Sequence, residues 1–156
     1  MGHCTIGLSF VGEWDRLSVG TPWSLDETAT HYGKQIVATL IKNFLNAPKQ
    51  FQEGSHGGSG PVDLQEIWSR ADFTSNVDFL DRVVIPPNST IGLHKHGNNE
   101  EMYIVLDGQA TMTIDGKPMP VGRGDMILNP AFGEHGLVND SDANVDLLVL
   151  QIGIVS

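Results

Sequence analysis

Cysteine and long hydrophobic runs are the two features that this sequence most clearly lacks. Its 156 residues include one cysteine, Cys4, which cannot form a disulfide within the chain. We therefore expect a reducing compartment, the cytoplasm. No apolar segment approaches the roughly 18 residues that a membrane-spanning helix needs. A core is still available, because 40% of the residues are hydrophobic and a chain of this length buries about two thirds of its unfolded surface.

Positive charge is also scarce. Nine Lys and Arg residues stand against nineteen Asp and Glu residues, which gives a net charge of −10 with the histidines taken as neutral. Such a charge repels phosphate backbones and anionic lipids. We therefore expect no nucleic-acid partner and no membrane partner, and a small molecule as the substrate or ligand.

A glycine-rich stretch at residues 53–61 (EGSHGGSGP) divides the chain into two parts of different character. We predict an N-terminal extension over residues 1–60 and a β domain over residues 61–156. His56, within the stretch, is interpreted as a loop residue.

The extension contains a pattern that predicts one amphipathic α-helix over about residues 24–46. Ser24 and Glu27 form a capping box after Pro22, and Pro48 follows the end of the pattern. Apolar residues recur between them at helical spacing: Ile36, Val37, Leu40, Ile41, Phe44 and Leu45. We expect this apolar stripe to pack on the main domain or on a second copy of the chain.

After residue 60 the hydrophobic period changes to two, as in β-strands. The expected strands cover residues 62–68, 77–85, 90–93, 102–106, 110–114, 126–128 and 145–154. Turn sequences separate them, and Asp115-Gly116 is the clearest two-residue hairpin signal. Many short strands with no helix between them predict an all-β sandwich or barrel.

Three histidines and one glutamate lie at spacings that such a fold can gather. His94 and His96 are one residue apart on a strand-forming segment, so their side chains share a face. A hydrophilic turn leads to Glu101, whose strand also carries Tyr103 on the same face, and His135 can supply a fourth ligand. Taken singly, each could be an ordinary core or surface residue. Together, three imidazoles and a carboxylate suit Mn²⁺, Fe²⁺, Co²⁺, Ni²⁺ or Zn²⁺.

Two motifs here resemble those of the cupin superfamily. Residues 92–108 (GLHKHGNNEEMYIVLDG) are similar to its first motif, His-x-His, three or four residues, Glu, six residues and Gly. Counting back six residues from Gly108 selects Glu101 over Glu100. Residues 124–139 (GDMILNPAFGEHGLVN) are similar to the second motif, with Gly, five residues, Pro, then His and an Asn four residues further on.

The sequence departs from the superfamily pattern at two turns. Asn88 occupies the place six residues before the first His where a glycine is usual. The glycine expected two residues after Pro130 has moved one place, to Gly133. Both departures leave the four candidate ligands in place.

The resemblance implies an all-β fold, a single cupin-type β-barrel or jelly roll preceded by the helical extension. It also implies one divalent metal held by His94, His96, Glu101 and His135, with Fe²⁺ or Mn²⁺ favoured. Cupins include oxygenases, isomerases, epimerases, lyases, decarboxylases and non-catalytic binding proteins, so fold alone does not choose the function.

We expect a metal-dependent enzyme that acts on a small polar metabolite, first of all an oxygenase or dioxygenase. Glu101 and Tyr103 are the candidate catalytic residues. The alternatives are an isomerase, epimerase or lyase acting on a sugar-like or keto-acid substrate, and a cupin that binds a small ligand without turnover. The resemblance and the spare apolar stripe also lead us to expect a homodimer.

Overall fold

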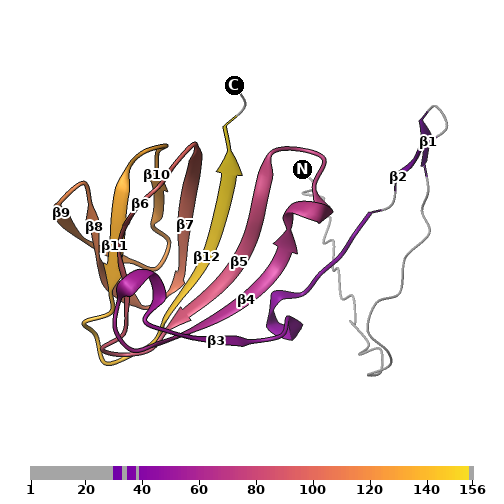
Figure 1. The fold of residues 1–156 in the computed structure, drawn as a ribbon. Helices are drawn as coiled ribbons and strands as arrows, with labels where there is room; N and C mark the ends of the chain where they lie inside the picture. The colour runs from indigo at the N-terminus through magenta and orange to yellow at the C-terminus, as the bar shows by residue number, and fades with distance from the viewer. Residues whose placement is uncertain (1–29, 33–34, 38, 155–156) are drawn as a thin grey trace, which may run out of the picture. The chain divides into compact units, whose positions relative to one another are not determined.

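The computed structural model describes residues 30–32, 35–37 and 39–154 (Figure 1). The chain divides into two compact units, Met1–Ile41 and Lys42–Ser156. In the first unit the described residues form an antiparallel hairpin of β1 (Thr30–Tyr32) and β2 (Gln35–Val37). Cys4 and the proposed capping box lie outside the described residues.

The predicted helix over residues 24–46 is wrong wherever the structure describes that segment. It contains β1, β2 and one 3-10 turn, η1 (Phe44–Asn46). Ile36 and Val37 are β-branched and favour strands, and Gly33 is a poor residue for a helix interior. The apolar spacing thus fitted a helix while local propensity opposed it. Among the described residues, no helix is long and apolar enough to cross a membrane.

The second unit is built from two antiparallel sheets that face each other (Figure 1). The six-stranded sheet has the order β10-β7-β12-β5-β4-β3, and the four-stranded sheet has the order β6-β11-β8-β9. The strands of the larger sheet are β3 (Gln50–Glu53), β4 (Pro61–Ser69), β5 (Val77–Ile85), β7 (Asn99–Asp107), β10 (Met126–Asn129) and β12 (Val145–Gly153). Those of the smaller sheet are β6 (Thr90–Lys95), β8 (Gln109–Ile114), β9 (Lys117–Gly122) and β11 (Glu134–Val138). Two further 3-10 turns are η2 (Ser55–Gly57) and η3 (Arg70–Asp72).

The all-β prediction is confirmed, whereas a closed barrel is not seen. No strand pairing among the described residues joins the six-stranded sheet to the four-stranded sheet. The architecture is therefore a pair of facing sheets of the jelly-roll kind.

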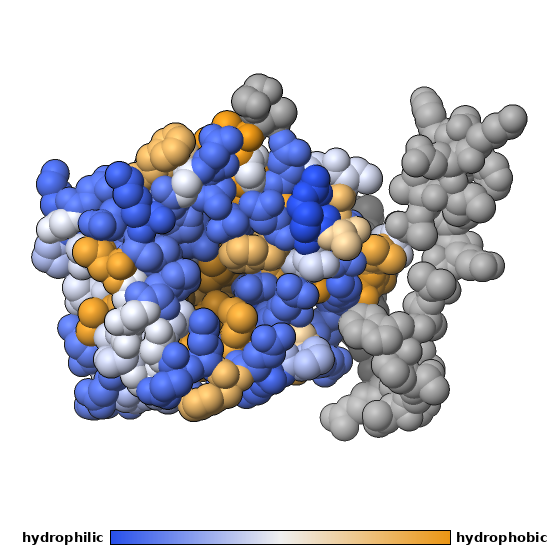
Figure 2. All heavy atoms as spheres, in the orientation of Figure 1, coloured by the Kyte–Doolittle hydropathy of each residue, from blue (hydrophilic) through white to orange (hydrophobic). Residues whose placement is uncertain are grey.

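The core lies between the two sheets and receives side chains from both. Ile85 and Leu147 come from the larger sheet, and Met112 and Leu137 come from the smaller one; all four are fully buried. Met112 is thus core filling. Figure 2 shows one face of the molecule, where apolar residues lie in a hollow surrounded by hydrophilic ones.

Most strands lie where the alternating pattern predicts them, and β5 has the predicted bounds, Val77–Ile85. Three strands of the second unit were missed: the edge strands β3 and β9, and the interior strand β11. β9 contains Pro118 and Pro120, which it tolerates because it is an edge strand, where a missing N–H can face solvent. The predicted hairpin at Asp115-Gly116 is confirmed, since both residues have positive φ (45° and 76°) and join β8 to β9.

Candidate metal centre

A β-bulge in β6 turns His94 toward the interior. Ile91 pairs with Leu137 of β11, and His94 pairs with His135. Between these pairs β6 advances three residues and β11 two, so β6 carries one extra residue opposite Gly136. Strict alternation would place Ile91 and His94 on opposite faces. The extra residue restores both to the interior, as the 5% exposure of Ile91 and the 53% exposure of Leu93 indicate.

The other ligand candidates come from three neighbouring segments. His96 follows β6, and its main-chain N–H donates to the Gly133 carbonyl oxygen at 2.9 Å. His135 lies on β11 with 0% exposure. Glu101 is a buried residue of β7, where it pairs with Asn129 on one side and with Gln151 on the other. Both sheets therefore contribute to the site.

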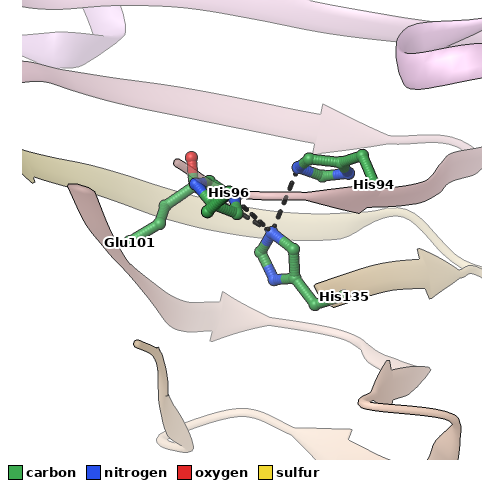
Figure 3. A group of neighbouring side chains, drawn as sticks. All are labelled: His94, His96, Glu101 and His135. Carbon is green, nitrogen blue, oxygen red and sulfur yellow. Dashed lines mark hydrogen bonds and ion pairs between the residues drawn. The ribbon is translucent and has the colours of Figure 1, made fainter. Parts of the chain in front are cut away.

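The four side chains converge at their tips (Figure 3). One ligand atom from each of His94, His96, Glu101 and His135 can be chosen so that all lie within 4.8 Å of one another. The Nε2 atom of His135 lies 3.2 Å from Nε2 of His94, 3.0 Å from Nε2 of His96 and 3.0 Å from Oε2 of Glu101. The His96 Nε2 atom lies 3.4 Å from the same carboxylate oxygen.

Hydrogen bonding alone cannot satisfy this cluster. A single N–H at Nε2 of His135 has one proton, whereas three possible acceptors surround that atom at 3.0–3.2 Å. A shared cation satisfies all of them. Donors about 2.1 Å from one ion lie at most about 4.2 Å apart. The four separations of 3.0–3.4 Å are shorter than this, and the remaining pairs of ligand atoms lie within 4.8 Å. The residues thus fit a divalent transition-metal ion in both chemistry and spacing.

Outer contacts orient two of the imidazoles for this role. The Nδ1 atom of His94 lies 2.9 Å from the Gly92 carbonyl oxygen, and Nδ1 of His96 lies 3.1 Å from Oδ1 of Asn99. With the Nδ1–H groups donating, each Nε2 keeps its lone pair for the centre of the cluster. Burial lowers the pKa of His94 below its ordinary value, which favours the neutral, metal-binding form.

Tyr103 lies against the cluster on the inner face of β7. Its ring centroid is 5.0 Å from that of His135, in an edge-on arrangement. Burial, and then the nearby charge of Glu101, raise the pKa of the Tyr103 hydroxyl well above its ordinary value. The phenol is therefore a neutral hydrogen-bond donor at the wall of the site.

A buried acid that the sequence analysis did not single out, Asp81, shares this inner face. Val149 of β12 pairs with Asp81 on one side and with Tyr103 on the other, so the three residues form one row across the sheet. Asp81 is 8% exposed, and its Oδ1 atom has no hydrogen-bond partner among the described residues. Burial, with the nearby charges of Glu66 and Glu101, raises the pKa of Asp81 to about 7. The sequence carries a signal for this buried acid, because Asp81 lies on the same strand face as the apolar residues Phe79, Val83 and Ile85.

The two turns that depart from the superfamily pattern adopt a backbone conformation that favours glycine. Asn88 has φ of 63°, and Phe132, two residues after Pro130, also has φ of 63°. Asparagine tolerates this region well, whereas an aromatic residue is strained there. Phe132 is 62% exposed. Its N–H donates to the Gly97 carbonyl oxygen at 3.1 Å, which places it beside the segment that follows His96.

Comparison with known proteins agrees with the fold and with the motifs. A family model for the cupin domain matches residues 81–151, a range that contains all four candidate ligands. A solved structure described as a predicted oxalate decarboxylase from Thermotoga maritima superposes with a TM-score of 0.72 at 23% identity. The superposition covers 74% of this chain and 100% of that one.

The chain contains a cupin domain at residues 81–151.

Two curated relatives share part of this chain's sequence. An oxalate-binding protein of Thermotoga maritima is 28% identical over 96 residues, which are 62% of this chain and 79% of that protein. An uncharacterized protein of Methanocaldococcus jannaschii is 37% identical over 71 residues, 46% of this chain and 55% of that protein. The structural likeness establishes the fold, whereas activity has to be argued from the site.

The structure thus brings together the four residues that the sequence analysis selected as ligands. Metal binding by them, and catalytic roles for Glu101 and Tyr103, stay predictions. His56, interpreted from sequence as a loop residue, lies against His94, with the two rings stacked at a centroid distance of 3.8 Å. Its only sequence signal was a histidine within a glycine-rich stretch.

Proposed function

We propose that this protein binds one divalent transition-metal ion through His94, His96, Glu101 and His135, and that a small oxygen-rich metabolite binds at that ion. Fe²⁺ and Mn²⁺ are favoured because imidazole and carboxylate ligands suit them, with Co²⁺, Ni²⁺ and Zn²⁺ as alternatives. The convergence of three Nε2 atoms and one carboxylate oxygen within 4.8 Å supports the proposal most directly.

When bound, such an ion supplies a Lewis acid with positions left open for oxygen atoms of a ligand. Glu101 contributes one negative charge to the site, and the neutral imidazoles contribute none. The Tyr103 phenol, buried against His135, offers a hydrogen-bond donor to an anionic ligand. The site therefore favours a small, oxygen-rich ligand with negative charge.

Oxalate is the first ligand to test. One relative, 28% identical to this chain, is named as an oxalate-binding protein, and a similar fold carries the description of a predicted oxalate decarboxylase. Oxalate also presents two adjacent carboxylate oxygens, which suits adjacent open positions on one ion.

Turnover by proton transfer is the second candidate, and Asp81 is the observation that favours it. A buried carboxyl with a pKa of about 7, on the same inner face as Glu101 and Tyr103, can hold or release a proton near neutral pH. This favours a decarboxylase, another lyase or an isomerase. The oxygenase expected from the sequence stays a prediction, as does the homodimer.

The metal assignment is tested by elemental analysis of protein purified without a metal-affinity tag, followed by titration of the metal-free protein with Mn²⁺ or Co²⁺. We expect His96→Ala to abolish metal retention, His135→Ala to weaken it severely and Glu101→Gln to weaken it less, since a carboxamide oxygen still coordinates. Glu100→Gln, on the neighbouring residue, is the matched control. Equal metal content in all variants would refute the assignment.

Ligand binding is tested by calorimetric titration of oxalate into metal-loaded, desalted protein. We expect binding that is lost in His135→Ala and in metal-free protein. Elemental analysis after the titration checks that oxalate has not simply removed the ion. Equal binding with and without metal, or no binding to the loaded protein, would refute the proposed ligand site. Carbon dioxide release on prolonged incubation would then separate a decarboxylase from a binding protein.

A further inference from the structure

The ring of His56 stacks on one of the candidate metal ligands. The His56 and His94 rings are 3.8 Å apart between centroids and 10° from parallel. The His94 ring is thus held on one side by this stack, while its Nδ1 atom contacts the Gly92 carbonyl oxygen. An imidazole with both its plane and one nitrogen fixed has little freedom to turn its Nε2 atom away from the cluster.

The loop that carries His56 is locked to β6 by contacts between main chains. A Cβ atom on Gly92 would lie 2.2 Å from the His56 carbonyl oxygen, and one on Gly58 would lie 2.4 Å from the Thr90 carbonyl oxygen. Thr90 N–H donates to the Ser59 carbonyl oxygen at 2.8 Å, and Ser59 N–H donates to Oγ1 of Thr90 at 2.7 Å. The loop and the strand that carries His94 therefore form one structural element.

The backbone of the loop is held in an unfavourable conformation at the residue that makes the stack. His56 has φ of 51° and ψ of 35°, in the left-handed region where a side chain is disfavoured. The neighbouring Gly54 and Gly57 also have positive φ, 62° and 74°. Residues with a strained backbone conformation cluster at the functional sites of proteins.

We infer that His56 is a positioning residue of the metal centre: its ring, presented by the Gly54–Gly60 loop, fixes the orientation of His94. This inference rests on the proposed metal site. It extends that site beyond residues 81–151, the range matched by the cupin family model. The role belongs to the flat ring and needs no nitrogen.

The test compares His56→Ala with His56→Phe, which removes the ring nitrogens but keeps a ring that can stack. Metal-free protein is titrated with Co²⁺, and both the dissociation constant and the visible absorption spectrum of the bound ion are recorded. We expect His56→Ala to bind Co²⁺ about tenfold more weakly, with an altered spectrum. We expect His56→Phe to stay near the wild type in both measures.

Two controls separate positioning from general stability. Phe51→Ala removes an exposed ring from β3, just before the loop, and is expected to leave Co²⁺ binding unchanged. Urea unfolding of each metal-free variant shows whether a loss of affinity merely follows a loss of fold. We expect His56→Ala to keep the unfolding midpoint of the wild type.

Each remaining outcome has a distinct meaning. Wild-type affinity and spectrum in His56→Ala would overturn the inference. Equal loss in His56→Ala and His56→Phe would also overturn it, because the ring nitrogen would then be the group that matters. A drop in affinity that tracks a drop in stability would reduce His56 to a structural residue. No Co²⁺ binding by the wild type would refute the metal site itself, together with the inference.

Discussion

Asp81→Asn should make the metal-free protein more stable at neutral and alkaline pH, and the gain should disappear in acid. The carboxyl is buried, and its Oδ1 atom has no hydrogen-bond partner among the described residues. Its ionised form is therefore disfavoured in the fold, whereas the unfolded chain ionises freely. An amide of nearly the same shape removes this penalty.

The size of the effect follows from the pKa of Asp81. A pKa raised from 3.8 to about 7 corresponds, at about 1.4 kcal/mol per pH unit, to a penalty of about 4 kcal/mol. Well below pH 3.8 the group is protonated in both states and contributes nothing. As the pH rises from about 4 to about 7 the folded state keeps a proton that the unfolded state has lost, so the free energy of unfolding falls. Above pH 7 the loss levels off.

The assay is urea unfolding between pH 4 and pH 8.5 in the presence of a chelator. The free energy of unfolding of Asp81→Asn minus that of the wild type should grow across this range toward about 4 kcal/mol. Asp142→Asn, which removes an exposed carboxylate, gives the background for losing one of the chain's net −10 charges. Profiles for Asp81→Asn and the wild type that stay parallel would refute the reasoning. A bound divalent cation near Glu101 should lower the pKa of Asp81 and shrink the difference.

Two backbone positions give further predictions, both measured by urea unfolding. Phe132→Gly should be more stable than Phe132→Ala by about 1 kcal/mol, because glycine relieves the positive φ of 63° and alanine does not; the reverse order would contradict the strain. Gly108→Ala should lose about 2–4 kcal/mol, because φ is +83° and the new Cβ would lie 2.4 Å from the Asn144 carbonyl oxygen. A loss below 0.5 kcal/mol, on the order of a surface substitution, would show that this turn relaxes freely.

Most strands were predictable because the inward and outward residues of a half-buried strand alternate along the sequence, as in β5. The helix prediction failed because apolar positions such as Ile36, Val37, Leu40 and Ile41 satisfy a helical period by spacing alone. The β-branched residues and Gly33 disfavour a helix, but the prediction gave more weight to the apolar spacing than to these propensities. The edge strand β9 was also missed; its sequence contains Pro118 and Pro120, and prolines are tolerated in an edge strand but not in a central one.

The candidate ligands could be selected because His94, His96, Glu101 and His135 fall within two short motifs of fixed spacing. Residues outside those motifs could not be selected in that way. His56 reaches His94 through a loop that approaches β6 at Gly92, and Asp81 joins the inner face through strand pairing with Val149. Both relations depend on tertiary contacts between distant segments, which carry no local signature.

The bulge in β6 also allows one short strand to supply both a core residue and a candidate metal ligand. On its N-terminal side Ile91 packs in the core, and on its C-terminal side His94 points into the ligand cluster. The extra residue lets Ile91 and His94 both face inward although they are three residues apart. Changes in packing around Ile91 therefore do not have to rotate the His94 ring, and changes at the ligand cluster do not have to open a cavity beside Ile91. Removing one residue at Gly92 or Leu93 would couple the two halves again and turn the imidazole away from the interior.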